Sequence, residues 1–290
     1  MRRAKKFGGP WLAGSDRSRY TGTMKQGQSI RPPAVSGLFY PDNPATLGKA
    51  VDSYLQSGIS ATTPPPRALI APHAGYRYSG PVAGSAYRSV QSMAGQITSA
   101  IILGPSHHVY FEGIARSGAD AFATPLGTMP VDREAESMLD ALSFVTVLPE
   151  AHRKEHGLEV HLPFLQVLFG DISILPLVVG ACDGTEVAQV LDTLAPGPET
   201  LVVISSDLSH HHPYAEAKAI DSETAQSIVE GRAQDLSSRR ACGYLPIQGL
   251  LLSSLAKGLT PTCVDLRNSG DTEGDRSQVV GYGAFVFSEA

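Results

Sequence analysis

Three apolar segments of strand length in this chain each run directly into a turn that carries histidine. The longest is residues 201–212, where Leu-Val-Val-Ile is followed by Ser-Ser-Asp-Leu-Ser and three consecutive histidines. Residues 68–76 and 100–108 repeat the arrangement with one and two histidines. In α/β proteins the polar groups that carry chemistry follow the carboxyl ends of buried strands. Because such turns meet at one edge of a sheet, the pattern predicts one site that gathers six of the nine histidines.

Segments with the patterns of helices and strands alternate along the chain. Helical periodicity covers residues 43–57, 132–142, 185–194 and 215–231, and apolar strands cover 172–179 and 279–287. Ser79 can cap a further helix that has Pro81 near its first turn. No linker typical of a domain boundary follows residue 66. We therefore predict an α/β fold, a single three-layer α/β/α domain with a central mixed sheet.

The N-terminal segment differs from the rest of the chain in composition. Residues 1–31 hold eight of the 23 basic residues and a single acid, Asp16. We expect residues 1–30, which are poor in apolar side chains, to be a disordered extension, and residues 31–290 to form the folded domain. The rest of the chain carries 15 basic and 27 acidic residues, a balance that argues against a nucleic-acid partner.

Cysteine usage and hydropathy bear on the compartment. The three cysteines, at positions 182, 242 and 263, are odd in number and widely spaced, so they do not suggest a disulfide framework. A reducing, cytoplasmic setting fits that usage. No apolar run approaches the roughly 18 residues that span a bilayer, so we expect no membrane partner. Glycines and a proline interrupt the segment after the basic start, which disfavours a signal peptide and leaves Met24 as an alternative initiator.

Among the turn histidines, His73 and His107 are the best candidates for metal ligands. Each is the first histidine after its apolar segment, and a neutral imidazole nitrogen binds Fe, Zn or Cu. A lone histidine at a strand end is more often structural, but three such turns at one sheet edge favour a shared site. We expect His108 to line the pocket or to support a ligand, because adjacent residues rarely point the same way.

In the third turn, Asp207 precedes His210 by three residues. A carboxylate near an imidazole fixes its tautomer and raises its basicity, so His210 is a candidate metal ligand or general acid/base. The alternative for Asp207 is a helix N-cap or turn residue. We assign Asp207 and His210 as candidate catalytic residues.

Cys242 admits two interpretations. A free cysteine is most often a small buried hydrophobic residue. Here it lies between two arginines, Arg239 and Arg240, and Gly243, just before an apolar helical segment. Nearby positive charge or a helix N-terminus would lower the pKa of the thiol, and the thiolate could then complete a metal site.

Residues 152–164 are unusually dense in titratable side chains. Glu155, His156, Glu159 and His161 suggest a further wall of the pocket, and positions 155 and 159 would share one face of a helix. The alternative is a charged helix face. The zinc-protease motif His-Glu-x-x-His is absent, as are the glycine-rich nucleotide loops and the serine-hydrolase elbow.

Taken together, these motifs resemble the Memo family, whose bacterial and archaeal members are called AmmeMemoRadiSam system protein B. The resemblance runs from about Gly37 to the C-terminus. It is carried by five motifs in order: Ala-Pro-His-Ala-Gly-Tyr at 71–76, Leu-Gly-Pro-Ser-His-His at 103–108, Glu-His at 155–156 with Glu159 and His-Leu-Pro at 161–163, Ser-Ser-Asp at 205–207 with His210, and Cys-Gly at 242–243 with Pro-Ile at 246–247.

The resemblance implies a LigB-like fold similar to the class III extradiol dioxygenases, in which two histidines and a carboxylate hold Fe(II) and another histidine is the acid/base. By position, His73 and His107 match the metal histidines, His210 matches the acid/base and Cys242 matches the third metal-site residue of Memo-type proteins. A thiolate in place of a carboxylate favours Fe, Zn or Cu(I) over hard cations and argues against ordinary catechol cleavage.

Two functions are therefore expected. The first is a non-haem metal enzyme, with Fe(II) preferred over Cu(I) or Zn, that carries out redox or dioxygenase-like chemistry on a small molecule. The second is a non-catalytic metal-binding or peptide-binding adaptor that uses the same pocket. The system name implies association with a radical SAM protein and an AMMECR-type protein, which is an association and not a mechanism.

Overall fold

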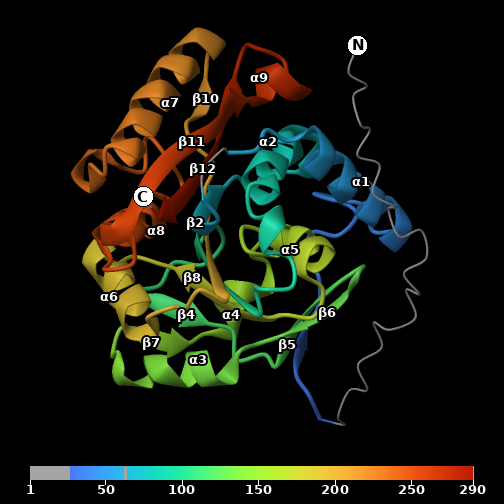
Figure 1. Cartoon of the computed structure of the whole chain (residues 1–290), viewed down its shortest axis with the longest axis vertical. Coiled ribbons are helices and arrows are strands. Elements are labelled where there is room, and N and C mark those ends of the chain that lie inside the picture. The colour runs from blue at the N-terminus through green and yellow to red at the C-terminus, as the bar shows by residue number, and fades with distance from the viewer. Residues whose placement is uncertain (1–26, 62–63, 290) are drawn as a thin grey trace, which may run out of the picture.

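A computed structural model describes residues 27–61 and 64–289 of the chain (Figure 1). Most of the expected disordered extension, residues 1–26, lies outside the described residues, and so does Met24. The first described strand begins at Ile30, next to the expected domain boundary. Within the described ranges, no helix combines the length and the apolar character that crossing a membrane requires.

Strands and helices alternate along most of the described chain. The strands are β1 Ile30–Arg31, β2 Pro66–Ala71, β3 Ser99–Pro105, β4 Ile114–Arg116, β5 Ala121–Thr124, β6 Gly127–Pro130, β7 Val145–Val147, β8 Ser173–Val179, β9 Thr200–Ser205, β10 His210–His212, β11 Leu259–Asn268 and β12 Val279–Glu289. The helices are α1 Pro44–Ser57, α2 Tyr76–Arg88, α3 Arg133–Met138, α4 Pro149–Arg153, α5 Leu162–Phe169, α6 Gly184–Leu194, α7 Tyr214–Val229, α8 Tyr244–Leu252 and α9 Ser269–Thr272.

One mixed sheet of nine strands forms the centre of the fold. Its order is β10-β12-β2-β9-β3-β8-β4-β7, with β11 paired to β12. The four middle strands, β2, β9, β3 and β8, are parallel, whereas β12 and β4 run antiparallel to them. A separate small sheet joins β1, β5 and β6. The carboxyl ends of β2, β9 and β3 therefore lie side by side at one edge.

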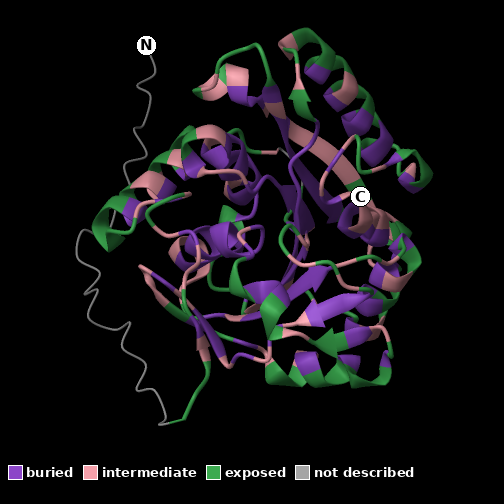
Figure 2. Ribbon diagram, turned by 180° about the vertical axis from the view of Figure 1, so that it is seen from behind, coloured by how far each residue is buried: buried purple, intermediate pink, exposed green. Residues whose placement is uncertain are grey.

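Alternate residues of each central strand pack against different helices, as the two-residue period of a strand requires. In β2, Leu69 and Ala71 belong to the core that contains α1, α2 and α5, whereas Ala68 and Ile70 belong to the core that contains α6, α7 and α8. The central strands are buried on both faces, and Figure 2 shows them as purple ribbons between the two helical layers. The predicted α/β fold, with a central mixed sheet flanked by helices, is confirmed.

Two local predictions are wrong. The helix expected to be capped by Ser79 already begins at Tyr76, so Pro81 lies inside it and not in its first turn. Residues 155 and 159 do not share a helix face, because α4 ends at Arg153 and a short 3-10 turn, Glu159–His161, precedes α5. Pro163 lies in the first turn of α5, where its missing N–H costs nothing.

Glu159 anchors residues 31–40 through its carboxylate. The carboxylate is fully buried and pairs with the buried guanidinium of Arg31. It also accepts hydrogen bonds from the amides of Ala34 (2.8 Å) and Val35 (3.0 Å) and from the hydroxyl of Tyr40 (2.6 Å). A single carboxylate thus fixes residues 31–40 against the body of the domain.

Replacing Glu159 by Gln is expected to lower the free energy of unfolding by about 3–5 kcal/mol, because the buried Arg31 guanidinium loses its counter-charge. Denaturant unfolding followed by circular dichroism measures this. Glu273→Gln is the matched control, because its pair with Arg77 (2.9 Å) is more than half exposed and should contribute less than about 1 kcal/mol. Equal effects of the two substitutions would contradict the anchoring role of Glu159.

Candidate metal centre

The order of the central strands brings the histidine turns together. β9 lies between β2 and β3, and the register aligns Ala71 at the end of β2 with Ser205 at the end of β9. His73 follows β2 by two residues, His107 follows β3 by two residues, and Asp207 follows β9 by two residues. These three residues are 34 to 134 positions apart in the sequence, yet all three lie at one edge of the sheet.

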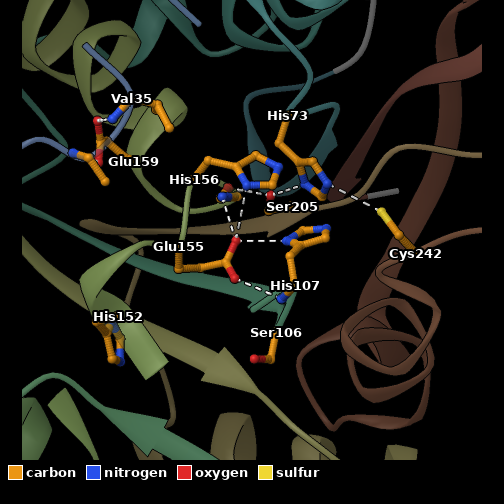
Figure 3. A network of polar contacts seen from close by, with 12 residues as sticks. Val35, His73, Ser106, His107, His152, Glu155, His156, Glu159, Ser205 and Cys242 are labelled. Carbon is orange, nitrogen blue, oxygen red and sulfur yellow. Dashed lines mark hydrogen bonds and ion pairs between the residues drawn. The ribbon is translucent and has the colours of Figure 1, made fainter. Parts of the chain in front are cut away.

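Three histidines form a compact group at this edge (Figure 3). His73, His107 and His156 each offer a ring nitrogen within 4.8 Å of the others, and the described residues contain this one such group. The ring centroids of His73 and His107 are 4.9 Å apart, and those of His107 and His156 are 4.4 Å apart. This group could hold a metal ion. His156, which the sequence placed only in the pocket wall, therefore lies among the candidate ligands.

The hydrogen bonds of Ser205 determine the tautomer of His73. The Ser205 hydroxyl donates its only proton to the carbonyl of Gly157 (2.5 Å). It must therefore accept the hydrogen bond that joins it to Nδ1 of His73 (2.6 Å). Nδ1 carries the proton, and the lone pair on Nε2 faces the pocket. An imidazole held in this way is prepared to bind a metal through Nε2.

Glu155 does the same for His107. Its carboxylate accepts from Nδ1 (2.7 Å) and from the backbone amide (2.8 Å) of His107, and from the amide of Gly157 (2.8 Å). Burial by itself would raise the pKa of Glu155, but these hydrogen bonds and the electrostatic interaction with His107 outweigh it and lower the pKa to about 2. The ionised carboxylate accepts from Nδ1 and orients the ring, so Nε2 is the nitrogen that the neutral imidazole can offer to a metal.

The other two rings are kept neutral by burial. Burial holds the pKa of His73 well below its usual range, with His107 and His156 adding to the effect. Burial is the main cause that lowers the pKa of His156 to about 4, and the nearby His107 lowers it further. Near neutral pH both imidazoles are therefore uncharged, which is the form that binds metals.

Cys242 lies beside His73. Its sulfur is 3.2 Å from Nε2 of His73 and accepts a hydrogen bond from the amide of Asp207 (3.3 Å). Burial and the neighbouring Asp207 carboxylate raise the pKa of the thiol to about 12. Arg239 and Arg240 were expected to lower the pKa of the thiol, and the shift is in the opposite direction. A bound cation would favour the thiolate instead.

Asp207 and His210 do not form the expected pair. The Asp207 carboxylate accepts from the amide of His73 (2.7 Å), and its backbone carbonyl accepts from the amide of Cys242 (3.2 Å). Nδ1 of His210 is instead hydrogen-bonded to the Leu208 carbonyl (2.8 Å), which fixes that ring without a carboxylate. Burial raises the pKa of Asp207 to about 7. Asp207 therefore ties the turns of His73 and Cys242 together.

The remaining predicted pocket residues lie in different surroundings. His108 is exposed and stands edge-on to His156, with ring centroids 5.9 Å apart. His161 is fully buried beside Tyr87, and neither of its ring nitrogens has a hydrogen-bond partner among the described residues. Burial lowers the pKa of His161 to about 3. Glu159 anchors residues 31–40, as described above.

Two supporting residues were missing from the sequence-derived site. No local pattern assigns a role to Ser205, because a hydroxyl at a strand end has no distinctive spacing. Gly157 is the second of these residues. A side chain there would place its Cβ 3.4 Å from the His107 ring and 3.2 Å from the Glu155 carboxylate, so glycine leaves room for both. The Glu-His-Gly sequence at 155–157 is the signal that could have identified it.

Two cavities meet at Cys242. One of about 430 Å³ is lined by His107, His108 and Tyr110 and by the start of α8. The other, of about 740 Å³, is lined by His210, His212 and the arginines before Cys242. Cys242 lines both cavities, so a ligand in either one can contact this residue.

Comparisons with known proteins agree in pointing to one family. The family model described as Memo-like protein matches residues 31–286. A MEMO1 family protein of Archaeoglobus fulgidus is 36% identical over 271 residues, covering 89% of this chain and 99% of that protein. MEMO1 family proteins of Sulfolobus acidocaldarius (34% identical, covering 90% and 100%) and Aquifex aeolicus (33% identical, covering 89% and 99%) are similar over the same extent.

A solved structure of an uncharacterized protein from Escherichia coli K12 aligns with a TM-score of 0.44 at 16% identity, over 75% of this chain and 98% of that one, and this likeness carries no weight here. The family model covers nearly all of residues 31–290, and several relatives above 30% identity are covered almost completely. The chain belongs to the Memo family.

Proposed function

We propose that this Memo-family protein binds a metal ion at the edge of its central sheet and uses it as a non-haem iron enzyme with redox or dioxygenase-like chemistry. The observation that carries the proposal is that two imidazoles are each held by a hydrogen bond at Nδ1. Ser205 and Glu155 each occupy Nδ1 of one histidine, so that Nε2 is the nitrogen that both His73 and His107 can offer to a metal. Such supporting contacts are the usual companions of metal-binding histidines.

The third ligand is either Cys242 or His156. Cys242 is supported by the 3.2 Å contact of its sulfur with Nε2 of His73, and His156 by its place in the compact histidine group. Nitrogen and sulfur donors suit Fe(II), Zn or Cu(I) better than hard cations. Fe(II), when bound, would supply open coordination positions and one-electron redox chemistry. We retain Fe(II) as the preferred metal on the strength of the family resemblance.

His210 is proposed to move the proton. It lines the 740 Å³ cavity together with Cys242, and its Nδ1 is engaged by the Leu208 carbonyl. Nε2 is then the nitrogen available for proton exchange with a ligand in that cavity. Asp207 is proposed to act by position, since it holds the backbone of His73 and of Cys242.

Two further proposals rest on the sequence resemblance and on cysteine chemistry. A reducing, cytoplasmic setting is supported by three cysteines that are all free in the described structure. Association with a radical SAM protein and an AMMECR-type protein stays a prediction from the family resemblance. Co-purification of the three proteins expressed together tests it.

Metal analysis of protein purified without oxygen tests the metal site. About one equivalent of metal per chain is expected, and His73→Ala and His107→Ala are expected to reduce affinity by more than the roughly 10- to 100-fold that loss of a supporting contact costs. Dioxygen uptake by the iron-loaded protein on addition of catechols or thiols supports an enzyme. Metal binding without any turnover supports the metal-binding adaptor. A folded wild-type protein that binds no metal contradicts the proposed metal enzyme and favours the peptide-binding adaptor.

Cobalt substitution identifies the third ligand. If Cys242 binds, the Co(II) protein shows a sulfur-to-metal charge-transfer band that Cys242→Ser abolishes and His156→Ala retains. If His156 binds instead, wild-type protein lacks the band, and His156→Ala weakens Co(II) binding more than Cys242→Ser does. Both variants are checked by thermal unfolding, so that loss of the fold is not mistaken for loss of a ligand.

Glu155→Gln is expected to weaken metal binding by roughly 10- to 100-fold, because a neutral amide supports the His107 imidazole less well than a carboxylate does. Competition with a chromogenic chelator measures the affinity. Glu150→Gln is the control, since Glu150 is half exposed and pairs only with Arg153 (2.5 Å). An unchanged affinity in Glu155→Gln would remove the supporting role assigned to this carboxylate.

A further inference from the structure

The 740 Å³ cavity reaches the candidate metal centre at Cys242. It shares Cys242 with the smaller cavity, and the Cys242 sulfur is 3.2 Å from Nε2 of His73. A molecule that reaches the proposed metal from this side therefore passes the residues that precede Cys242. These include Arg239 and Arg240.

The two arginines differ in what they contact. Arg240 donates to the carboxylate of Glu223 (2.9 Å), so its charge is balanced inside the cavity. Arg239 makes no ion pair and no side-chain hydrogen bond with any residue in the described ranges, 27–61 and 64–289. The imidazole of His212, on the same cavity, pairs with Glu216 (2.9 Å). Arg239 is thus the uncompensated cation of this cavity, in a chain whose net charge is −5.

The backbone holds Arg239 in a fixed relation to the thiol. The amides of Arg240 and Ala241 both donate to the Ser237 carbonyl (2.9 and 3.1 Å). The amide of the next residue, Cys242, donates to the Asp207 carbonyl (3.2 Å). A short turn closed at both ends by hydrogen bonds limits where the guanidinium can reach, which reduces the entropy lost when it binds a ligand.

The smaller cavity has the opposite character. No lysine, arginine, aspartate or glutamate lines it, and Tyr110, Phe111 and Tyr244 contribute aromatic surface. Tyr110 is 84% exposed, although it is a large side chain that a folded protein usually covers. Cys242 therefore lines both a cavity with aromatic surface and a cavity that presents the Arg239 guanidinium.

We propose that the ligand of this site is an organic anion, with its apolar part in the aromatic cavity and a carboxylate or phosphate group bound by Arg239. A guanidinium binds either group with two parallel hydrogen bonds, which gives orientation as well as affinity. Arg239 is then a specificity-determining residue that places the remainder of the molecule next to Cys242. The inference rests on the proposed function, because it takes the metal site as the place of reaction.

Fluorine NMR with matched probes tests the inference. Para-fluorophenylpropionate and the corresponding neutral amide differ only in the charged group, and para-fluorobenzylphosphonate replaces the carboxylate by a phosphate analogue. Binding is measured first on metal-free protein, so that coordination of the anion to a metal does not contribute. The acid is expected to bind at least about tenfold more tightly than the amide, and comparison of acid with phosphonate shows which anion is preferred.

Arg239→Gln is expected to abolish the preference for the acid, whereas Arg240→Gln, whose parent side chain is already paired with Glu223, retains it. Thermal unfolding confirms that both variants are folded. Equal binding of acid and amide to wild-type protein, no detectable binding of either anion, or a preference that survives in Arg239→Gln would each overturn the inference. A preference that is lost only in Arg239→Gln supports it even if the protein proves unable to bind metal, so the two proposals fail separately.

Discussion

The pairing of β9 between β2 and β3 is the constraint on which the rest of the site depends. Parallel register aligns Ala71 with Ser205, so the turns that follow these strands leave the sheet at the same level. The Ser205 hydroxyl then contacts both the His73 ring and the Gly157 carbonyl. One side chain at a strand end therefore joins three segments that are distant in sequence and fixes the nitrogen that His73 presents to the pocket.

Glu155 and Glu159 lie four residues apart in the irregular connection between α4 and α5, and they have different roles. One supports the candidate metal site, and the other stabilises the fold. Glu155 faces the sheet edge and orients His107, whereas Glu159 faces away and holds Arg31 and the N-terminal segment. Residues 31–40 also place Phe39 against His156, with ring centroids 4.8 Å apart. The anchor at Glu159 therefore reaches the candidate metal centre indirectly, through the packing of the segment that it fixes.

Burial explains the raised pKa values on the Cys242 side of the site. Burial raises the pKa of both Cys242 and Asp207, and each lies beside the other. A bound metal ion would reverse this balance, because a cation favours the charged form of a neighbouring thiol or carboxylate. If Cys242 is the third ligand, metal binding would be coupled to deprotonation of its thiol, and the affinity for metal would depend on pH.

The sequence by itself determined the α/β fold and the positions of His73 and His107, because apolar strands that end in polar turns can be read from local pattern alone. It did not determine which side chains touch. Asp207 contacts the His73 backbone and not His210, Glu155 and Glu159 serve different segments, and His156 joins the histidine group. Strand order and an irregular loop decided these contacts, because side-chain direction at the end of an element depends on packing against segments far away in the chain, which no local pattern records.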